Sequence, residues 1–442
     1  MERLFAAPAP PADLLIAGAR VVDPGSGLDG PSLDVRIHEG VIAEIGPDLP
    51  RTEVETIDAD GLVLLPGLVD PHVHLRTPGD EDEEGVASGT RAAAAGGFTA
   101  ILAMPNTRPV VDTPIVLSGL VQRAGREAVV PTGFMAAITA GQEGERLAEM
   151  VALAEAGAAA FSDDGRPVER AAILRRAFQY ASVTGLRLAL HEEDLSLSGG
   201  ADMHEGAVSA ELGLEGYPSI AESVMVGRDL AIARYEGAPV HVCHVSAAES
   251  VAEIRRAREL GVDVTAEVTP HHLCLTDEHV RSLDAGRAKM SPPLRAATDR
   301  AALIEALADG TLDCIGTDHA PHRGHEKEQP FAHAPNGVIG LETAFPAVYT
   351  HLVEPGLVPL AAIVERMSTG PAAAFGLPRP AIREGERASL CLWDLAASWL
   401  VQPPYASRSA NCAFAGQTLR ARCHLTIAAG AVAHRLIEAV AA

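Results

Sequence analysis

Short apolar runs recur through the middle of the chain, and helix-forming stretches rich in Ala, Glu and Arg separate them. Continuous apolar runs of this kind are typical of strands buried on both faces, as in a parallel sheet. The runs are residues 62–69, 98–104, 129–138, 157–161, 186–190, 239–245, 262–268 and 312–316. Helices are expected near 84–95, 113–127, 143–156, 168–184, 219–236, 247–260, 298–309, 339–353 and 360–375. This alternation predicts an α/β fold, the (β/α)8 or TIM-type barrel.

Both ends of the chain carry a different pattern, in which short strands follow one another with only Gly, Pro and Asp between them. The expected strands are Leu14–Ile16, Val21–Val22, Asp34–Ile37, Val41–Ile45 and Val54–Ile57 at the start, and Ala388–Trp393, Leu419–Ile427 and Ala431–Arg435 at the end. We therefore expect residues 1–65 and 378–442 to form one small β-sandwich-like domain beside a barrel at residues 66–377.

Metal-ligating side chains follow the apolar runs at the positions where strands should end. Catalytic residues of such barrels lie at the carboxyl ends of the strands, so these side chains should meet at one mouth. They are His72 and His74 after the first run, Asp163 and Asp164 after the fourth, His191 after the fifth, His244 at the sixth, and Asp318 after the eighth. The long polar segments 191–219 and 318–338 read as loops over this mouth. Imidazole nitrogen and carboxylate oxygen together favour zinc, and six ligands, with one carboxylate from the pair Asp163 and Asp164, suit two ions.

The charge of the chain limits what it can bind. The formal net charge is -24, which argues against a nucleic-acid or anionic-membrane partner. An anionic substrate would need a local cation. Arg76 is such a cation, because it shares a strand face with His72 and His74.

The remaining composition favours a cytoplasmic location. The six cysteines form no C-x-x-C pair and imply no disulfide framework. The first residues lack the pattern of a secretory signal, and no apolar stretch is long enough to span a membrane.

Several motifs together resemble the amidohydrolase superfamily, and within it the bacterial class I dihydroorotases. They are PGLVDPHVHLR, GGFTAILAMPNTRP, FSDDG, HEED, HVCHVSAAES, VTAEVTPHHL, PPLR, TDHAPH and GLETAFP, and the resemblance covers nearly the whole chain. It implies a zinc-dependent, reversible cyclisation of N-carbamoyl-L-aspartate to (S)-dihydroorotate with loss of water, a step of de novo pyrimidine biosynthesis.

Carried over residue by residue, the resemblance implies a centre of two zinc ions. His72, His74 and Asp318 would bind one ion and His191 and His244 the other, with Asp164 and a hydroxide bridging them. Asp164 is preferred to Asp163 because the family pattern places the ligand directly before the glycine. Many relatives use a carbamylated lysine as the bridge, but this chain has no lysine before residue 289. Asp318 would also act as the catalytic proton carrier.

The resemblance also implies a set of substrate contacts. They are His74, Arg76, Asn106, Ser291, His322, Asn336 and Gly337. Three positions depart from the family pattern: Ser291 stands where Asn is usual, Thr77 where an acidic residue is usual, and Glu83 where Lys is common. These departures leave the exact substrate open.

Two alternative functions come from the same superfamily. A hydantoinase- or allantoinase-like cyclic amidohydrolase is one, although Arg76, Asn106 and His322 favour an anionic substrate. A catalytically silent scaffold for aspartate transcarbamoylase is the other, but such relatives typically lose ligands and this chain keeps all six. An active enzyme could still bind aspartate transcarbamoylase or form a homodimer.

Overall fold

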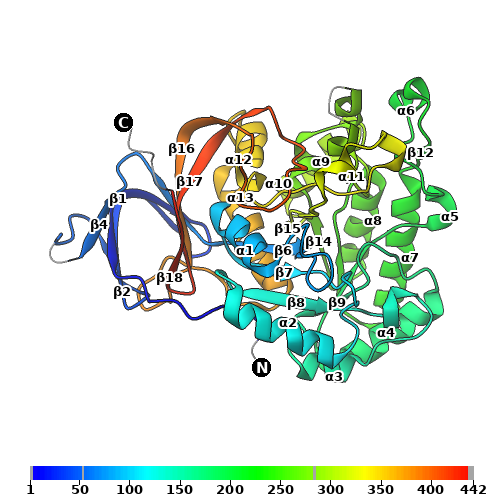
Figure 1. Ribbon diagram of the computed structural model, residues 1–442, viewed down its shortest axis with the longest axis horizontal. Coiled ribbons are helices and arrows are strands. Elements are labelled where there is room, and N and C mark those ends of the chain that lie inside the picture. Colours follow the sequence, from blue (N-terminus) through cyan, green and yellow to red (C-terminus); the bar gives the residue numbers. More distant parts are fainter. Residues whose placement is uncertain (1–2, 52–53, 282–284, 437–442) are drawn as a thin grey trace.

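The computed structural model describes residues 3–51, 54–281 and 285–436. Figure 1 shows a helix-covered barrel on one side and a separate sheet-rich region on the other. Residues 1–2, 52–53 and 437–442 of the expected small domain lie outside the described residues. Among the residues described, no helix has the length and apolarity that crossing a bilayer would require.

Eight parallel strands form the barrel, in the order β15-β14-β13-β10-β9-β8-β7-β6. They are β6 (Leu68–Val73), β7 (Phe98–Ala103), β8 (Thr132–Ala136), β9 (Ala160–Ser162), β10 (Leu188–Leu190), β13 (Val240–Val242), β14 (Val264–Val268) and β15 (Cys314–Ile315). A parallel bridge between Val73 and His319 brings the last strand segment back to the first, so the ring nearly closes. The predicted barrel is therefore confirmed, and each predicted run contains a barrel strand or leads directly into one.

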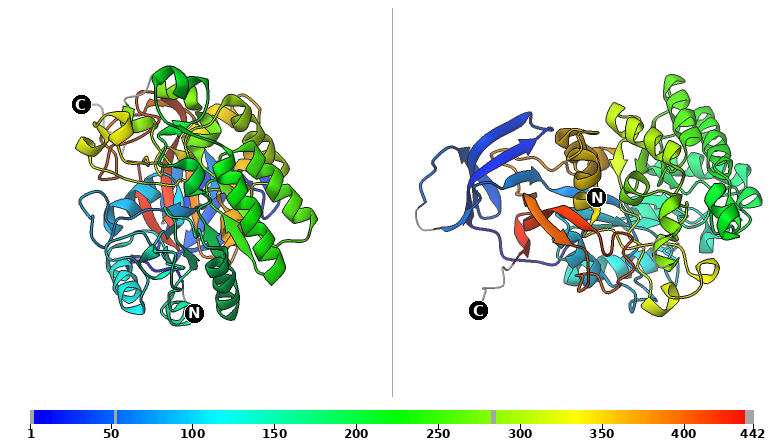
Figure 2. Two further views of the ribbon diagram at one scale, coloured as in Figure 1. Left: turned by 90° about the vertical axis from the view of Figure 1, so that its right-hand side faces the viewer. Right: turned by 90° about the horizontal axis from the view of Figure 1, so that it is seen from above.

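Helices surround these strands, as the end-on view in Figure 2 shows. The helices between and after the strands are α1 (Val86–Ala95), α2 (Pro114–Glu127), α3 (Met150–Glu155), α4 (Ala171–Thr184), α7 (Ile220–Glu236), α8 (Ala248–Glu259), α9 (Pro270–Cys274), α10 (Ala297–Asp309), α12 (Ala344–Val348), α13 (Leu360–Met367) and α14 (Thr369–Ala374). Helix α4 shows why they form. Its buried residues Ile173, Leu174, Ala177, Phe178 and Ala181 lie on one face, and Gly185 ends it in the left-handed conformation at φ 69°.

The first apolar run divides into two strands that belong to different sheets. Strand β5 (Val63–Pro66) pairs in the small sheet, whereas β6 begins the barrel. Gly67 separates them, and a Cβ atom at this position would lie 2.1 Å from Thr99 Oγ1. Only glycine permits this close approach of the backbone to β7.

Three predicted helices are shorter or divided. The segment 143–156 is helical only over α3, because Gly141 and Gly144 take positive φ values in the irregular loop before it. The segment 339–353 contains α12 followed by the π-helix η5 (Tyr349–Val353). The segment 360–375 divides into α13 and α14 at Ser368.

Both predicted loops contain short elements. The segment 191–219 holds α5 (Leu195–Ser198), β11 (Met203–His204), α6 (Ala207–Leu212) and β12 (Gly216–Tyr217). The segment 318–338 holds α11 (Gly324–Lys327) and η4 (Phe331–His333). Short 3-10 turns η1 (Ala140–Gln142), η2 (Asp277–Arg281) and η3 (Ala285–Ala288) complete the barrel loops.

Strands from both ends of the chain build the second sheet, which is seen from above in Figure 2. Its order is β18-β17-β16-β5-β1-β2-β3, with β4 paired to β1. The strands are β1 (Leu14–Asp23), β2 (Leu28–His38), β3 (Val41–Gly46), β4 (Glu55–Asp58), β16 (Leu390–Leu400), β17 (Thr418–Ala428) and β18 (Ala431–Arg435). The antiparallel pairing of β16 with β5 joins the two ends, for example Leu390 opposite Pro66. The exact domain boundaries at 65/66 and 377/378 stay predictions.

Candidate metal centre

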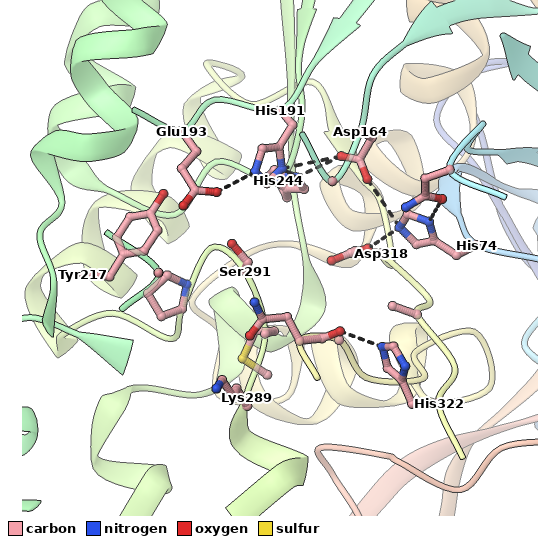
Figure 3. Close-up of a pocket in the computed structure, with 18 of the residues that line it drawn as sticks. His74, Asp164, His191, Glu193, Tyr217, His244, Lys289, Ser291, Asp318 and His322 are labelled. Carbon is pink, nitrogen blue, oxygen red and sulfur yellow. Dashed lines mark hydrogen bonds and ion pairs between the residues drawn. The ribbon is translucent and has the colours of Figure 1, made fainter. Parts of the chain in front are cut away.

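The six predicted ligands come together at the carboxyl ends of the barrel strands, and Figure 3 labels all of them except His72. All six are buried. They follow five different strands: His72 and His74 at the end of β6, Asp164 after β9, His191 after β10, His244 after β13, and Asp318 after β15. Far-separated segments of sequence therefore meet within a few ångströms.

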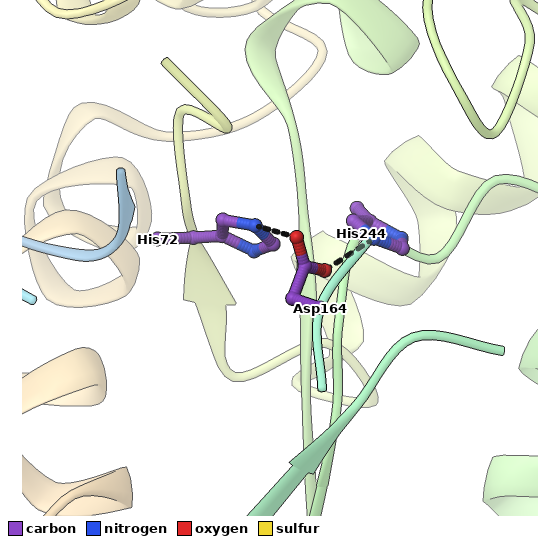
Figure 4. A group of neighbouring side chains, drawn as sticks. All are labelled: His72, Asp164 and His244. Carbon is purple, nitrogen blue, oxygen red and sulfur yellow. Dashed lines mark hydrogen bonds and ion pairs between the residues drawn. The ribbon is translucent and has the colours of Figure 1, made fainter. Parts of the chain in front are cut away.

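Asp164 occupies the middle of this group (Figure 4). Its Oδ2 lies 3.3 Å from His72 Nε2 and 3.5 Å from His74 Nε2. Its Oδ1 lies 3.2 Å from His244 Nε2 and 3.7 Å from His191 Nδ1. Each carboxylate oxygen thus faces its own pair of imidazoles, which is the arrangement that a bridging ligand needs.

Asp318 completes the set on the side of His72 and His74. Its Oδ1 lies 3.0 Å from His74 Nε2 and 3.6 Å from His72 Nε2. The donor atoms of His72, His74 and Asp318 form one compact group, and those of His72, Asp164 and His244 form another.

The spacing of these donor atoms fits metal coordination. Ligands at 2.0–2.1 Å from a tetrahedral zinc ion lie roughly 3.3 Å from one another, and the histidine–carboxylate distances above run from 3.0 to 3.7 Å. His72 Nε2 is buried and makes no hydrogen bond, although two carboxylates lie close to it. A buried nitrogen without a partner is costly, and a cation at this point would satisfy it.

Hydrogen bonds on the far side of the rings fix which nitrogen faces the centre. His72 Nδ1 donates to Glu267 Oε1 at 2.5 Å, and His74 Nδ1 donates to Asn106 Oδ1 at 2.8 Å. His191 Nε2 donates to Glu193 Oε2 at 3.0 Å. When the rings are neutral, the opposite nitrogen of each can direct its lone pair toward the centre, as in metal-binding histidines.

The charges of the site favour a positive ion. Burial works against ionisation of Asp164, but His72, His191 and His244 lower its pKa well below the ordinary value. Burial likewise opposes a charged His191, but Asp164 and Glu193 raise its pKa to about 10. The carboxylates are therefore ionised at neutral pH and attract a proton or a metal ion.

Glu267 is a site residue to which sequence reasoning gave no role. It lies on β14, is buried, and contacts His72 through one oxygen and His241 Nε2 at 3.3 Å through the other. Burial acts to raise the pKa of Glu267, but the opposing effect of His72 and His241 is larger and lowers the pKa to about 2. The signal in the sequence was an acidic residue inside an apolar strand, VTAEV.

Asp70 was also missed, and it ties the first strand to the last. Its Oδ1 accepts hydrogen bonds from the His72 backbone N–H at 3.1 Å and from the Thr317 backbone N–H at 3.0 Å. Its Oδ2 accepts from the Thr317 hydroxyl at 2.5 Å. This carboxylate holds the segments of His72 and Asp318 in register.

Three predicted site residues have left-handed backbone conformations. The φ angles are 50° for Arg76, 32° for His244 and 47° for Asp318. Such conformations are unfavourable for residues other than glycine and concentrate at functional sites. The fold therefore imposes local strain where these side chains enter the centre.

A cavity of about 290 Å³ opens beside the six ligands. The predicted substrate contacts all line it, namely His74, Arg76, Asn106, Ser291, His322, Asn336 and Gly337. Gly337 has φ 119°, and a Cβ atom there would lie 2.6 Å from the Ala320 Cβ. The wall of the cavity at this point thus requires glycine.

Arg76 and His322 form the cationic side of the cavity. Arg76 Nε donates to the Pro321 carbonyl at 3.1 Å, and its Nη2 lies 3.4 Å from His322 Nε2. His322 Nε2 donates to the Asn336 carbonyl at 2.7 Å. Burial, Arg76 and Lys327 lower the pKa of His322 to about 3, so this ring is neutral and Arg76 carries the positive charge.

The two lysines of the chain hold the loops over the cavity, a role that the sequence did not indicate. Lys327 Nζ donates to the carbonyls of Pro335 and Gly337 at 2.7 Å and to that of Lys289 at 3.2 Å. Lys289 Nζ donates to Asp202 Oδ1 at 3.1 Å. Together they connect the segments 191–219 and 318–338 through residue 289.

The sequence of the chain is similar to those of known proteins. A family model described as Dihydro-orotase-like matches residues 61–250. The dihydroorotase of Trichlorobacter lovleyi is 44% identical over 422 residues, covering 95% of this chain and 99% of the relative. The dihydroorotase of Anaeromyxobacter sp. (strain K) is 47% identical over 424 residues, covering 95% and 98%.

Solved structures with the same fold come from related activities. The L-hydantoinase (dihydropyrimidinase) of Arthrobacter aurescens superposes with a TM-score of 0.84 at 26% identity, with 97% of each chain covered. The dihydropyrimidinase of Brevibacillus agri superposes with a TM-score of 0.81 at 25% identity, covering 96% of this chain and 95% of the other.

Proposed function

The chain belongs to the dihydroorotase family of the amidohydrolase superfamily, and from that membership we propose that it interconverts N-carbamoyl-L-aspartate and (S)-dihydroorotate. Cyclisation joins the terminal ureido nitrogen to the side-chain carboxyl carbon and releases one water. Hydrolysis of the ring amide is the reverse reaction. The observation that supports this proposal best is the position of Asp164 between two histidine pairs, with Arg76 lining the same cavity.

The residues suit a centre of two zinc ions. His72, His74 and Asp318 would hold one ion, His191 and His244 the other, and Asp164 would contact both. When bound, the ions would lower the pKa of water and polarise the carbonyl group that reacts. Nitrogen and carboxylate donors without a thiolate favour zinc over softer metals.

Asp318 is the residue that we assign to proton transfer. In hydrolysis its carboxylate would accept the proton of the attacking water and pass it to the ring nitrogen that leaves. In cyclisation it would take the proton from the ureido nitrogen and return it to the departing oxygen. The histidines around Asp318 keep its pKa below the ordinary value despite burial, so it starts as the acceptor.

Arg76 is the residue that we assign to the free carboxylate of the substrate. A guanidinium group can bind a carboxylate through two parallel hydrogen bonds. Because His74 Nδ1 donates to Asn106 Oδ1, the Asn106 amide N–H groups remain to donate to the same carboxylate. The one N–H donor of neutral His322 is Nε2, which donates to the Asn336 carbonyl at 2.7 Å and would turn to the same carboxylate on binding.

A hydantoinase-like activity is the second candidate, since the similar solved structures are a hydantoinase and a dihydropyrimidinase. Ser291 lines the cavity, and its short hydroxyl leaves the ring edge less specified than Asn would. The test is turnover of dihydroorotate, hydantoin, allantoin and dihydrouracil by protein of known metal content. We expect dihydroorotate to be turned over fastest. Turnover of hydantoin or allantoin without dihydroorotate would reverse the assignment.

Association and location remain predictions. The resemblance is compatible with a homodimer and with a complex with aspartate transcarbamoylase, and the composition of the chain favours a cytoplasmic location. Analytical ultracentrifugation of the chain alone, and then with aspartate transcarbamoylase, tests both forms of association.

A further inference from the structure

Arg76 is already paired with a carboxylate in the protein. Glu83 Oε2 lies 3.4 Å from Arg76 Nε. Both side chains are largely buried, with exposed fractions of 14% for Arg76 and 9% for Glu83. Two opposite charges with little water between them interact more strongly than a surface pair. Glu83 therefore partly neutralises the charge of Arg76, the cation that we assign to the substrate.

The contacts of Glu83 are loose. Its other neighbours are Arg323 Nη1 at 3.5 Å and His322 Nδ1 at 3.9 Å. These distances exceed the roughly 2.7–2.9 Å of a close charge-assisted hydrogen bond. Burial, acting against Arg76, raises the pKa of Glu83, which indicates that the ion pairs compensate its lost hydration only in part. A carboxylate held in this way is easily replaced as the partner of Arg76.

Arg76 lies between two cavities. The first is lined by every predicted metal ligand except His72 and measures about 290 Å³. The second measures about 370 Å³ and is lined by Glu83, while Arg76, Asn106 and His322 line both. The guanidinium can thus interact with Glu83 on one side and with an anion beside the metal centre on the other.

We propose that Glu83 competes with the substrate's carboxylate for Arg76 and thereby sets how tightly the substrate binds. In the empty site Glu83 neutralises the guanidinium, and substrate binding transfers the guanidinium from Glu83 to the substrate. An anion entering the cavity then meets an ion pair instead of a lone cation, which weakens its binding. This inference rests on the proposed function, because it requires a substrate with a free carboxylate.

The test is the kinetic effect of Glu83→Gln on dihydroorotate hydrolysis. Removing the competing charge should lower KM about three- to tenfold, in the range expected for a partly solvated ion pair. The value of kcat should change less than about twofold, since Glu83 contacts none of the groups assigned to proton transfer. Glu83→Ala should also lower KM. This second variant serves as the test if the glutamine variant folds poorly.

Glu81→Gln is the matched control. Glu81 lies on the same loop and carries the same charge, but its side chain pairs with Arg123 at 2.9 Å. The KM of the Glu81→Gln variant should stay within about twofold of the wild-type value. A double-mutant cycle with Arg76→Gln completes the set, since Glu83→Gln should have no effect on KM once the guanidinium is gone.

The proposed function and the role of Glu83 are contradicted by different results. Wild-type protein that does not turn over dihydroorotate contradicts the proposed function. Wild-type turnover with an unchanged or increased KM in both Glu83 variants overturns the role of Glu83 alone. A fall in KM that persists in the Arg76→Gln background also overturns it, because the effect would then not pass through Arg76.

Discussion

At the scale of single residues, the pair Asp163-Asp164 shows what the sequence could and could not decide. Both carboxylates follow the same strand, and residue type alone left the choice open. The structure places Asp164 between the histidines, while Asp163 turns away and accepts backbone hydrogen bonds from Ile138 at 2.8 Å and Thr139 at 3.1 Å. Asp164 lies in the turn after β9, which the Arg166 backbone N–H closes on the Asp163 carbonyl at 2.8 Å, and residue type alone does not say which side chain such a turn directs into the centre.

Exchange of Asp164 for Asn tests this distinction. Asp164→Asn keeps the size but removes the charge shared by the two histidine pairs, so we expect loss of at least one bound metal ion and more than about 100-fold lower turnover. Elemental analysis and initial rates measure both effects. Asp163→Asn is the matched control and should retain its metal. Equal metal content in the two variants would contradict the bridging assignment.

The neutral ring of His322 predicts a pH effect on stability. Its pKa in the folded protein is about 3, below the ordinary value of about 6.5. Between these values the unfolded chain binds a proton that the folded chain does not, so the residue costs stability as pH falls through this window and has no effect above it. His322→Gln should therefore make the free energy of unfolding less sensitive to pH between 6.5 and 4.

Denaturant titrations of metal-free protein at several pH values measure this effect. The exposed residue His325 lies three positions away, and His325→Gln supplies the control. A slope with pH that is identical in wild type and His322→Gln would show that the ring is protonated in the folded protein.

At the scale of elements, the apolar runs predicted the barrel strands because strands covered on both faces must be apolar throughout. What they could not predict was where one strand stops. The first run contains β5 and the start of β6, and Gly67 divides them because Thr99 leaves no room for a side chain. The short α3 has a similar origin, since Gly141 and Gly144 bend the backbone before it. These boundaries depend on tertiary contacts that lie far away in the sequence.

The sequence also did not predict which side chains of neighbouring strands contact one another. Glu267 is the centre of one such group. Glu267 on β14 orients His72 on β6 and contacts His241 on β13. Glu267→Gln should lower metal affinity about 10- to 100-fold, because a weaker acceptor leaves the His72 ring less firmly oriented. Competition with a zinc-chelating dye measures the affinity. Wild-type affinity in this variant would assign Glu267 a structural role only.

At the scale of the whole molecule, the sheet shared by the two chain ends is built onto the barrel. Trp393 on β16 is fully buried, and its ring lies 4.5 Å from that of Phe345 on α12. A Cβ atom on Gly97 would lie 2.6 Å from Trp393 Cζ2, so the indole packs directly on the barrel backbone. The sequence predicted that the ends would form strands, but not which side chain joins the two parts.

Trp393→Ala should accordingly lower the free energy of unfolding by about 3–5 kcal/mol, the usual cost of deleting a buried aromatic side chain. Chemical denaturation measures the change. Trp399→Ala on the same strand removes a half-buried indole and should cost less. Because Trp393 lies outside the metal centre, kcat of the folded Trp393→Ala protein should stay near that of the wild type. A loss of kcat without loss of stability would contradict this separation.

The most direct test of the whole account is a zinc titration of metal-free protein, followed by the rate of dihydroorotate hydrolysis. If Asp164 is the ligand that both ions share, the metal-free protein should have almost no activity. The rate should then rise with added zinc and stop rising at two zinc ions per chain. Full activity in the metal-free protein, or no hydrolysis of dihydroorotate at any zinc content, would contradict the assignment of a metal-dependent dihydroorotase.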